Sequence, residues 1–265
     1  MEILGYSTAL LIGLSLGLMG GGGSILTVPV MVYIFGFNPI LATAYSLFVV
    51  GVSSFIGMLG KLKQKLVSFR IAIIFAIPAF VSVFFTRRYL LPMLPETLLD
   101  LGGFEISKSV GIMLLFAIVM LVASFSMIRG RKQLSEMESK GGNPTKTGQI
   151  MLQGLGVGLL TGIVGAGGGF LIIPALVLLA KLPMKTAVGT SLLIISANSL
   201  VGFVGDLQSG SEIDWKFLLI FTSIAILGIL VGNYFSTKIE GAKLKKGFGW
   251  FVLIMAIVIL GKELL

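Results

Sequence analysis

The length of the apolar runs limits the possible folds more than any other feature of this sequence. Mostly apolar residues occupy a series of long stretches, at 3–35, 40–60, 68–86, 106–128, 149–180, 184–205, 214–236 and 247–264. A helix that spans a bilayer needs about 20 apolar residues, whereas strands of a membrane barrel are shorter and alternate in polarity. With 56% hydrophobic residues, 12% charged residues and a mean hydropathy of +1.05, the chain is predicted to be an all-α, polytopic membrane helical bundle.

Two glycine clusters interrupt these runs. The first is Gly20 to Gly23, followed by Ser24, and the second is Gly165 to Gly169, with Ala166 inside it. Because consecutive glycines lose much backbone entropy in a helix, each apolar run is predicted to form two shorter helices. The helix after the first cluster begins with unpaired N–H groups and the positive end of its dipole, which is a favourable place for an anion.

The two halves of the chain repeat each other. Residue n matches residue n+145 without a gap over the first two segments of each half, as in the identical pairs Gly20/Gly165, Pro29/Pro174, Ser46/Ser191, Ser54/Ser199 and Gly57/Gly202. Matching Pro and Ser pairs in one register favour a duplication over chance. We therefore expect a first transmembrane repeat at 1–128, a linker at 129–147 and a second repeat at 148–265.

The basic residues indicate how the repeats lie in the membrane. If each glycine-broken run returns to the side that it entered from, loops 61–70, 129–147, 181–185 and 238–246 share one face and hold fifteen of the 20 Lys and Arg residues. Such a bias is typical of a cytoplasmic face. The sequence thus predicts a cytoplasmic linker, both termini outside, and two inverted-topology repeats, each with a re-entrant or double-crossing hairpin and three full transmembrane helices.

Polar residues recur beside the glycine clusters in both halves. Ser46 and Ser53 lie two helical turns apart on one face, as do Ser191 and Asn198. Such hydroxyl and amide groups suit an oxyanion, although Ser53 and Ser54 are equally well explained by bonds to their own helix. The predicted substrate-binding residues are Gly20, Gly21, Gly22, Gly23, Ser24, Tyr45, Ser46, Gly165, Gly167, Gly168, Gly169, Thr190, Ser191 and Asn198.

Other glycines have a simpler interpretation. Gly13 and Gly17, or Gly228 and Gly232, have the four-residue spacing that lets membrane helices pack closely. Close packing is also the alternative interpretation of the glycine clusters, but three or four glycines in a row exceed what packing needs.

Composition argues against several functions. The chain has no Cys and no His, and no acidic or basic residue falls inside a predicted full crossing, so we expect no enzyme activity, no metal, no cofactor and no side-chain proton relay. The net charge of +9 comes from short loops that orient the chain, so no nucleic-acid partner is expected. The expected partners are a small anionic substrate and the lipid bilayer.

The segments GGGGSILTVP and GAGGGFLIIP, each followed by an Ala-x-x-x-Ser-Leu element, resemble the sulfite exporter family called TauE/SafE over nearly the whole chain. The resemblance implies a multi-pass permease of the plasma (inner) membrane for sulfur-containing oxyanions such as sulfite or organosulfonates. It implies that the paired motifs form the transport path. From the inverted repeats and the glycine breaks we expect alternating access at a midplane site. An anion channel and a cation-coupled importer of an organic anion are the alternatives, and a coupled Na⁺ or H⁺ and a homodimer stay open.

Overall fold

Helices make up nearly all of the secondary structure of the described residues. The computed structural model describes residues 2–37, 39–90, 93, 95, 97–100, 105–129, 147–164, 169–207 and 213–264. Its first-half helices are α1 (Glu2–Met19), α2 (Gly22–Tyr33), α3 (Pro39–Lys63), α4 (Phe69–Phe85), the π-helix η1 (Thr86–Leu90) and α6 (Lys108–Arg129). The second half has α8 (Thr147–Val164), α9 (Gly169–Pro174), the π-helix η2 (Ala175–Leu179), α10 (Met184–Leu207), α11 (Trp215–Lys238) and α12 (Gly241–Leu264).

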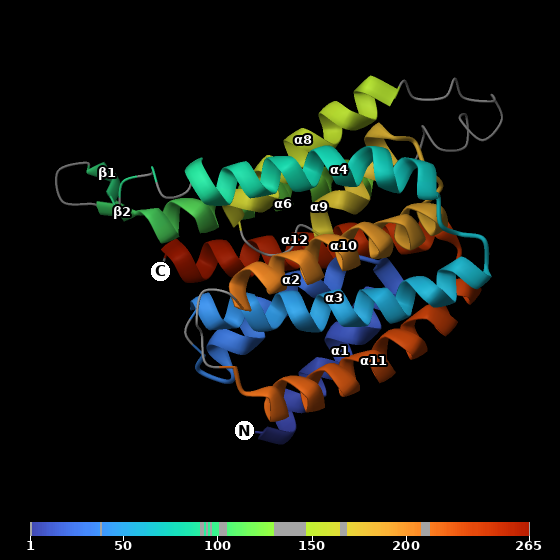
Figure 1. Ribbon diagram of the computed structural model, residues 1–265, viewed down its shortest axis with the longest axis horizontal. Helices are drawn as coiled ribbons and strands as arrows, with labels where there is room; N and C mark the ends of the chain where they lie inside the picture. The colour runs from blue at the N-terminus through green and yellow to red at the C-terminus, as the bar shows by residue number, and fades with distance from the viewer. Residues whose placement is uncertain are drawn as a thin grey trace.

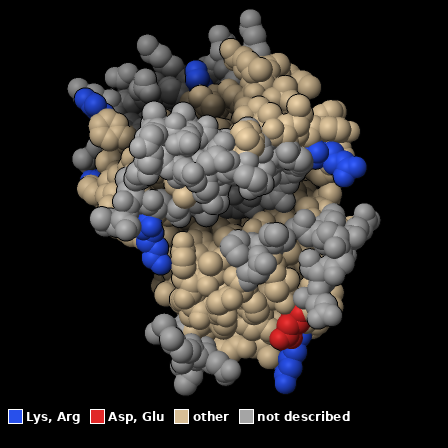
Figure 2. Space-filling model, turned by 90° about the vertical axis from the view of Figure 1, so that its left-hand side faces the viewer, with Lys and Arg blue, Asp and Glu red and all other residues tan. Residues whose placement is uncertain are grey.

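Several of these helices are long and apolar enough to cross a membrane. Within the described residues, five candidate spans meet that criterion, at Leu41–Lys63, Phe69–Leu90, Met184–Val204, Trp215–Lys238 and Ala242–Lys262. Figure 2 shows one end of the molecule, where separate Lys and Arg side chains stand around the margin of a described surface that is otherwise mostly uncharged. The prediction of a helical membrane protein is confirmed at this level.

The first apolar run is interrupted where the glycines stand. Helix α1 ends at Met19 and α2 begins at Gly22. Between them Gly20 has a φ of +74°, a left-handed conformation that costs a residue with a Cβ roughly 1–2 kcal/mol. In the second run the described part of α8 ends at Val164 and α9 begins at Gly169. Gly165 to Gly168 lie outside the described residues, as does most of the predicted linker.

Helix α2 packs back along α1. A Cβ placed on Gly23 would lie 2.3 Å from the carbonyl oxygen of Ile12. Farther along, the ring of Phe35 reaches Gly5 at the start of α1, and it lies 6.1 Å from the ring of Tyr6 between centroids. The start of α2 therefore contacts the middle of α1, and the residues after the end of α2 contact the beginning of α1, so the two helices run in opposite directions.

Each half contributes one helix to each outer pair of the bundle. Figure 1 shows α1 beside α11 at the bottom and α4 beside α8 at the top, with α2, α3, α10 and α12 between them. Glycines bring both pairs into backbone contact. A Cβ on Gly13 of α1 would lie 1.9 Å from the oxygen of Ala225 in α11, and one on Gly158 of α8 would lie 2.3 Å from the oxygen of Ala79 in α4. The packing role predicted for Gly13 fits this geometry, and Gly158 has the same role.

Details of one half recur in the other at the offset of 145 residues. The amide of Phe37 donates to the carbonyl of Met31 over 3.1 Å, and that of Leu182 donates to Leu176 over 2.9 Å. Gly36 and Lys181, which precede these donors, both have a positive φ, of 72° and 58°. The chain thus leaves α2 and η2 through the same kind of turn.

The central pair, α3 and α10, is packed reciprocally. A Cβ on Gly57 would meet the side chain of Leu192 at 3.4 Å, and one on Gly202 would meet the side chain of Leu47 at 3.3 Å. As residue numbers rise along α3 they fall along α10, so the two helices run in opposite directions.

A short pair of strands was not predicted from the sequence. Strand β1 (Thr97–Asp100) pairs antiparallel with β2 (Glu105–Ser107) in the connection between α4 and α6. Figure 1 shows the pair projecting from the end of the bundle near the C-terminus. It lies away from the glycine breaks.

Candidate functional site

The first glycine break meets Gly169, the first residue of α9. A Cβ on Gly21 would lie only 2.0 Å from the carbonyl oxygen and 2.5 Å from the carbonyl carbon of Gly169. A Cβ on Gly169 would in turn lie 2.8 Å from the hydroxyl oxygen of Ser24. Because real Cβ atoms do not approach a backbone carbonyl this closely, Gly21 has no room for a side chain, whereas at Gly169 the neighbouring side chains of Ser24 and Ile195 would have to shift.

The first break also packs against α10. Gly20 faces Ser191 and Val188, and a Cβ there would lie 2.7 Å from the Ser191 hydroxyl oxygen and 3.0 Å from the Val188 carbonyl oxygen. The predicted residues Gly20, Gly21, Ser24, Gly169 and Ser191 are therefore brought together, although they come from both halves of the chain. We call this group of five the break cluster.

The hydroxyls of the break cluster are held by the backbone. Ser24 is fully buried and donates to the carbonyl oxygen of Gly21 over 2.7 Å. Ser191 is also fully buried and donates to the carbonyl oxygen of Val188 over 2.9 Å. Each hydroxyl keeps its oxygen lone pairs, and each can turn its proton toward a ligand that replaces the bond.

The start of α2 supplies the positive side of the cluster. Its cap residue is Gly21, and no side chain of the described residues caps this end. The first N–H groups of an α-helix have no partner within the helix, and the dipole adds about half a positive charge there. This end of α2 can therefore stabilise an anion without a charged side chain.

Gly23 belongs to a different contact. Its neighbours are Ile12, Ser15 and Leu16, all on α1. Gly23 therefore serves the packing of α2 on α1, whereas Gly20 and Gly21 face the second half.

Tyr45 and Thr190 also lie outside the break cluster, in equivalent positions of the two halves. The Tyr45 hydroxyl accepts a hydrogen bond from the backbone N–H of Asp214 over 2.7 Å, just before α11. The Thr190 hydroxyl accepts one from the backbone N–H of Ser68 over 3.0 Å, just before α4. Each side chain thus joins the central helix pair to the start of an outer helix.

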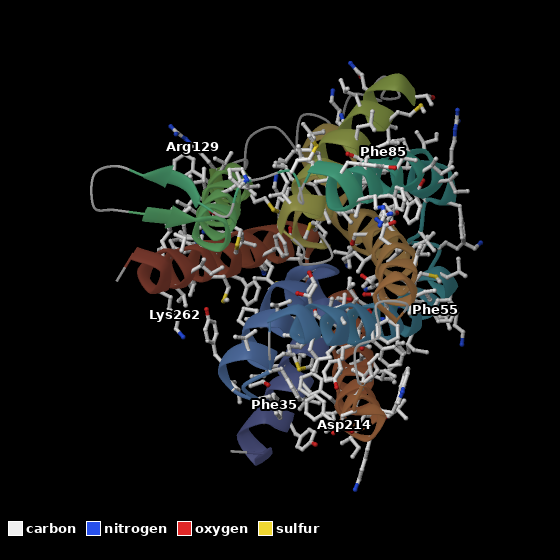
Figure 3. All side chains as sticks on the ribbon, turned by 60° about the vertical axis from the view of Figure 1, so that its left-hand side comes forward. Phe35, Phe55, Phe85, Arg129, Asp214 and Lys262 are labelled. Carbon is white, nitrogen blue, oxygen red and sulfur yellow. The ribbon has the colours of Figure 1, made fainter. Side chains whose placement is uncertain are left out.

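An aromatic cluster surrounds Tyr45. Its ring lies 5.1 Å from that of Phe37 and 5.9 Å from that of Phe217 between centroids. Figure 3 shows Phe35 and Asp214, two labelled neighbours of this cluster, at the same end of the molecule. Tyr45 is therefore a packed residue at the end of the bundle.

The remaining predicted residues are less informative. Ser46 is buried on α3, and Asn198 is half-buried on α10, two turns beyond Ser191. Gly22 begins α2. Gly165, Gly167 and Gly168 fall outside the described residues.

Sequence reasoning missed a buried lysine. Lys61 was assigned to a loop, yet it lies in the last turn of α3, is only 2% exposed and donates to the hydroxyl of Ser236 on α11. Ser236 donates to the carbonyl of Asn233, whose amide nitrogen donates to the carbonyl of Gly57 over 2.8 Å. These bonds tie α3 to the C-terminal end of α11, where a cation is favoured by the helix dipole.

The polar groups found here are uncharged, apart from lysines near helix ends. The part of the chain that the structure describes contains no cluster of three or more His, Cys, Asp or Glu residues that could hold a metal. The chemistry offered by the break cluster is hydrogen-bond donation from backbone amides and hydroxyls.

Comparison with known proteins identifies the family. The family model described as "Sulfite exporter TauE/SafE" matches residues 6–259. The chain belongs to the TauE/SafE sulfite exporter family. The resemblance carried by the glycine motifs is thereby confirmed, and the matched range includes both breaks and the central pair α3 and α10.

Curated relatives of this TauE/SafE protein are described as transporters. A "Probable membrane transporter protein" of Xylella fastidiosa is 28% identical over 96% of this chain and 92% of its own length. "Probable membrane transporter protein YunE" of Bacillus subtilis is 26% identical over 92% of this chain and 89% of its own length. "Probable membrane transporter protein MJ0441" of Methanocaldococcus jannaschii is 28% identical over 76% of this chain and 71% of its own length. No solved structure gives a significant match. The protein is thus a membrane transporter by family.

Proposed function

We propose that this protein is a secondary transporter that moves small sulfur-containing oxyanions, such as sulfite or organosulfonates, across the plasma membrane. The anion binds at the break cluster, and alternating access exposes that site to one side of the membrane at a time. The observation that carries the proposal is the contact between Gly21 and Gly169, because it joins the interrupted helices of both halves. Interrupted helices that meet between repeats are where secondary transporters bind their substrates.

Inverted repeats are part of the proposal. The 145-residue offset converts Gly57 into Gly202 and Leu47 into Leu192, so the contacts Gly57/Leu192 and Leu47/Gly202 are equivalent. Both contacts join α3 to α10, which run in opposite directions. A two-fold axis that exchanges two antiparallel helices lies perpendicular to both. For helices that cross a bilayer, such an axis lies in the membrane plane, so the two halves have opposite topology.

The donors of the break cluster suit an oxyanion. Uncapped N–H groups at the start of α2 and the hydroxyls of Ser24 and Ser191 offer hydrogen bonds without a fixed opposite charge. Such a site holds an anion weakly enough to release it, since a buried ion pair would not form. The family description, sulfite exporter, supports sulfite as the first anion to test.

The close contact also defines a movement. A Cβ on Gly21 would lie only 2.0 Å from the Gly169 oxygen. The space between Gly21 and Gly169 is therefore too small for an anion. We infer that the breaks separate to admit the anion and close again behind it. Export then follows the membrane potential, which drives an anion out of a negative interior by about 2.3 kcal/mol per charge per 100 mV.

Flux through purified protein in liposomes tests this function. Labelled sulfite inside the vesicles should leave at a rate that saturates with concentration, and unlabelled sulfite outside should accelerate the exchange. Sulfonate, sulfate and carboxylate anions complete the panel. Flux that stays linear in concentration and does not respond to unlabelled sulfite would identify a channel, and sulfite flux equal to that of protein-free liposomes would refute the proposal.

A further inference from the structure

Three serine hydroxyls in the central helix pair have no hydrogen-bond partner among the described residues. They belong to Ser53 and Ser54 on α3 and to Ser199 on α10, and all three side chains are 0% exposed. An unpartnered buried hydroxyl costs about 1–3 kcal/mol, so a native structure that retains several of them calls for an explanation.

Other buried serines of this chain avoid that cost. Ser15, Ser124 and Ser191 each donate to the backbone carbonyl three residues earlier in their helix, at 2.9, 2.8 and 2.9 Å. Ser53, Ser54 and Ser199 also lie within helices, where a carbonyl stands at the same spacing. Their hydroxyls nevertheless make no such bond, so these protons are free for another acceptor.

The contacts of neighbouring glycines place Ser54 and Ser199 where the two central helices meet. Ser54 follows Gly51 by three residues on α3, and a Cβ on Gly51 would lie 3.2 Å from the backbone nitrogen of Leu200, the neighbour of Ser199 on α10. Residues three or four apart share a helix face, so Ser54 lies on the face that meets α10. Ser54 and Ser199 are also equivalent under the 145-residue offset, and both stand near the middle of their helices.

This position is connected to the break cluster. A Cβ on Gly169 would lie 2.9 Å from the Ile195 side chain, and Ser199 follows Ile195 by one helical turn on α10. Ser199 therefore lies about one turn of α10 away from a residue that contacts the break cluster.

We propose that Ser53, Ser54 and Ser199 form a second binding station for the transported oxyanion, between α3 and α10 at the centre of the bundle. Hydroxyl protons donated from both helices take the place of water around the anion oxygens. This inference rests on the proposed function, because its ligand is the same anion. It adds residues outside the break cluster that determine how tightly the anion is held in transit.

Alanine variants separate this station from a structural role. Ser54→Ala and Ser199→Ala, singly and together, are compared with Ser124→Ala, a buried serine of α6 whose hydroxyl bonds to its own helix. The two readouts are sulfite exchange in liposomes and the thermal unfolding temperature of the purified protein without and with sulfite.

Removing a hydroxyl that bonds to the anion should raise the half-saturating sulfite concentration about tenfold, because a hydrogen bond to a charged group is lost. Without sulfite, the same variants should unfold at the wild-type temperature or above it, because an unpartnered hydroxyl has been removed. The stabilisation by sulfite should fall in both variants and fall further in the double variant, in which the break cluster still binds the anion, whereas Ser124→Ala should be stabilised by sulfite as the wild type is.

Wild-type half-saturation in the double variant would overturn the station while leaving the proposed function intact. A lower unfolding temperature without sulfite, combined with unchanged stabilisation by sulfite, would also overturn it and indicate a structural role. If the wild type neither transports nor is stabilised by sulfite, the proposed function fails as well, and these outcomes are distinguishable.

Discussion

Replacing Gly21 by alanine introduces one methyl group at the point where the halves meet. Its carbon would lie 2.0 Å from the Gly169 oxygen and 3.1 Å from a methyl carbon of Ile173. The Ile173 side chain can turn away, but the Gly169 carbonyl belongs to the backbone. The breaks would have to move apart by about 1 Å to reach a normal contact distance, and overpacking of this kind costs about 1–3 kcal/mol.

That cost falls on the closed arrangement alone, since separated breaks accommodate the methyl group. The population of the closed state relative to open states should drop by roughly 5- to 150-fold. Alternating access needs closure in every cycle, so exchange of labelled for unlabelled sulfite should fall by a similar factor. The assay is exchange in liposomes that contain equal amounts of inserted protein.

The matched control is Gly156→Ala in α8. Gly156 is exposed, and a Cβ there has no neighbour within 4 Å among the described residues. Alanine should support the helix by about 0.5–1 kcal/mol and leave exchange unchanged. Wild-type exchange in Gly21→Ala would refute the reasoning that contact between the breaks is part of the transport cycle.

Three further changes test the packing around the site. Gly13→Ala would place a methyl group 1.9 Å from a carbonyl oxygen of α11 and should destabilise the protein by about 1–3 kcal/mol, seen as a lower unfolding temperature in detergent. Tyr45→Phe keeps the ring but removes the acceptor for the Asp214 amide, which should cost about 0.5–1.5 kcal/mol in the same measurement. Lys61→Met replaces a buried cation by an apolar chain of similar length and leaves Ser236 bonded to its own helix, so stability should be equal or higher.

Controls and contrary results for these changes are direct. The control for Gly13→Ala is Gly148→Ala in α8, because a Cβ on Gly148 has no described neighbour within 4 Å. Tyr234→Phe, at an exposed tyrosine of α11, serves for Tyr45. Lys63→Met, at an exposed lysine of the same turn, serves for Lys61. Unaltered unfolding in Gly13→Ala or Tyr45→Phe would contradict the respective contact. A clear loss of stability in Lys61→Met would show instead that the Lys61 bond to Ser236 outweighs the cost of burying the cation.

The elements followed from the sequence because their causes are local. Consecutive glycines disfavour helix wherever they occur, so the break at Gly20 and Gly21 was predictable from chain entropy alone. The apolar runs determine which segments can cross a bilayer, and the 145-residue offset paired Gly57 with Gly202, which make equivalent contacts in the structure.

The roles of single residues depended on partners far away in the chain. Tyr45 and Thr190 belong to the same repeated motif as Ser46 and Ser191, but their hydroxyls accept from amides 169 and 122 residues distant. A one-dimensional pattern predicts which residues share a helix face and leaves open which backbone amide meets that face. For the same reason the sequence could not separate Gly23, which packs on α1, from Gly21, which meets the other half.

The polar stripe of the central helices was only partly interpretable. The seven-residue spacing of Ser46 and Ser53 predicted a shared face, but for Ser53 and Ser54 binding and back-bonding were equally good explanations. Whether a serine bonds to its own helix depends on its side-chain rotamer, which is decided by packing against α10. The unpartnered hydroxyls favour the first explanation.

The most direct test of the central claim is to locate the anion in the protein. Selenite has the shape and charge of sulfite, and its selenium atom gives an anomalous signal in crystals of protein with ordinary methionine. Our account predicts an anomalous peak beside the start of α2, within hydrogen-bond reach of Ser24 or Ser191. Peaks confined to surface lysines, or none at saturating selenite, would contradict a binding site at the meeting point of the two glycine breaks.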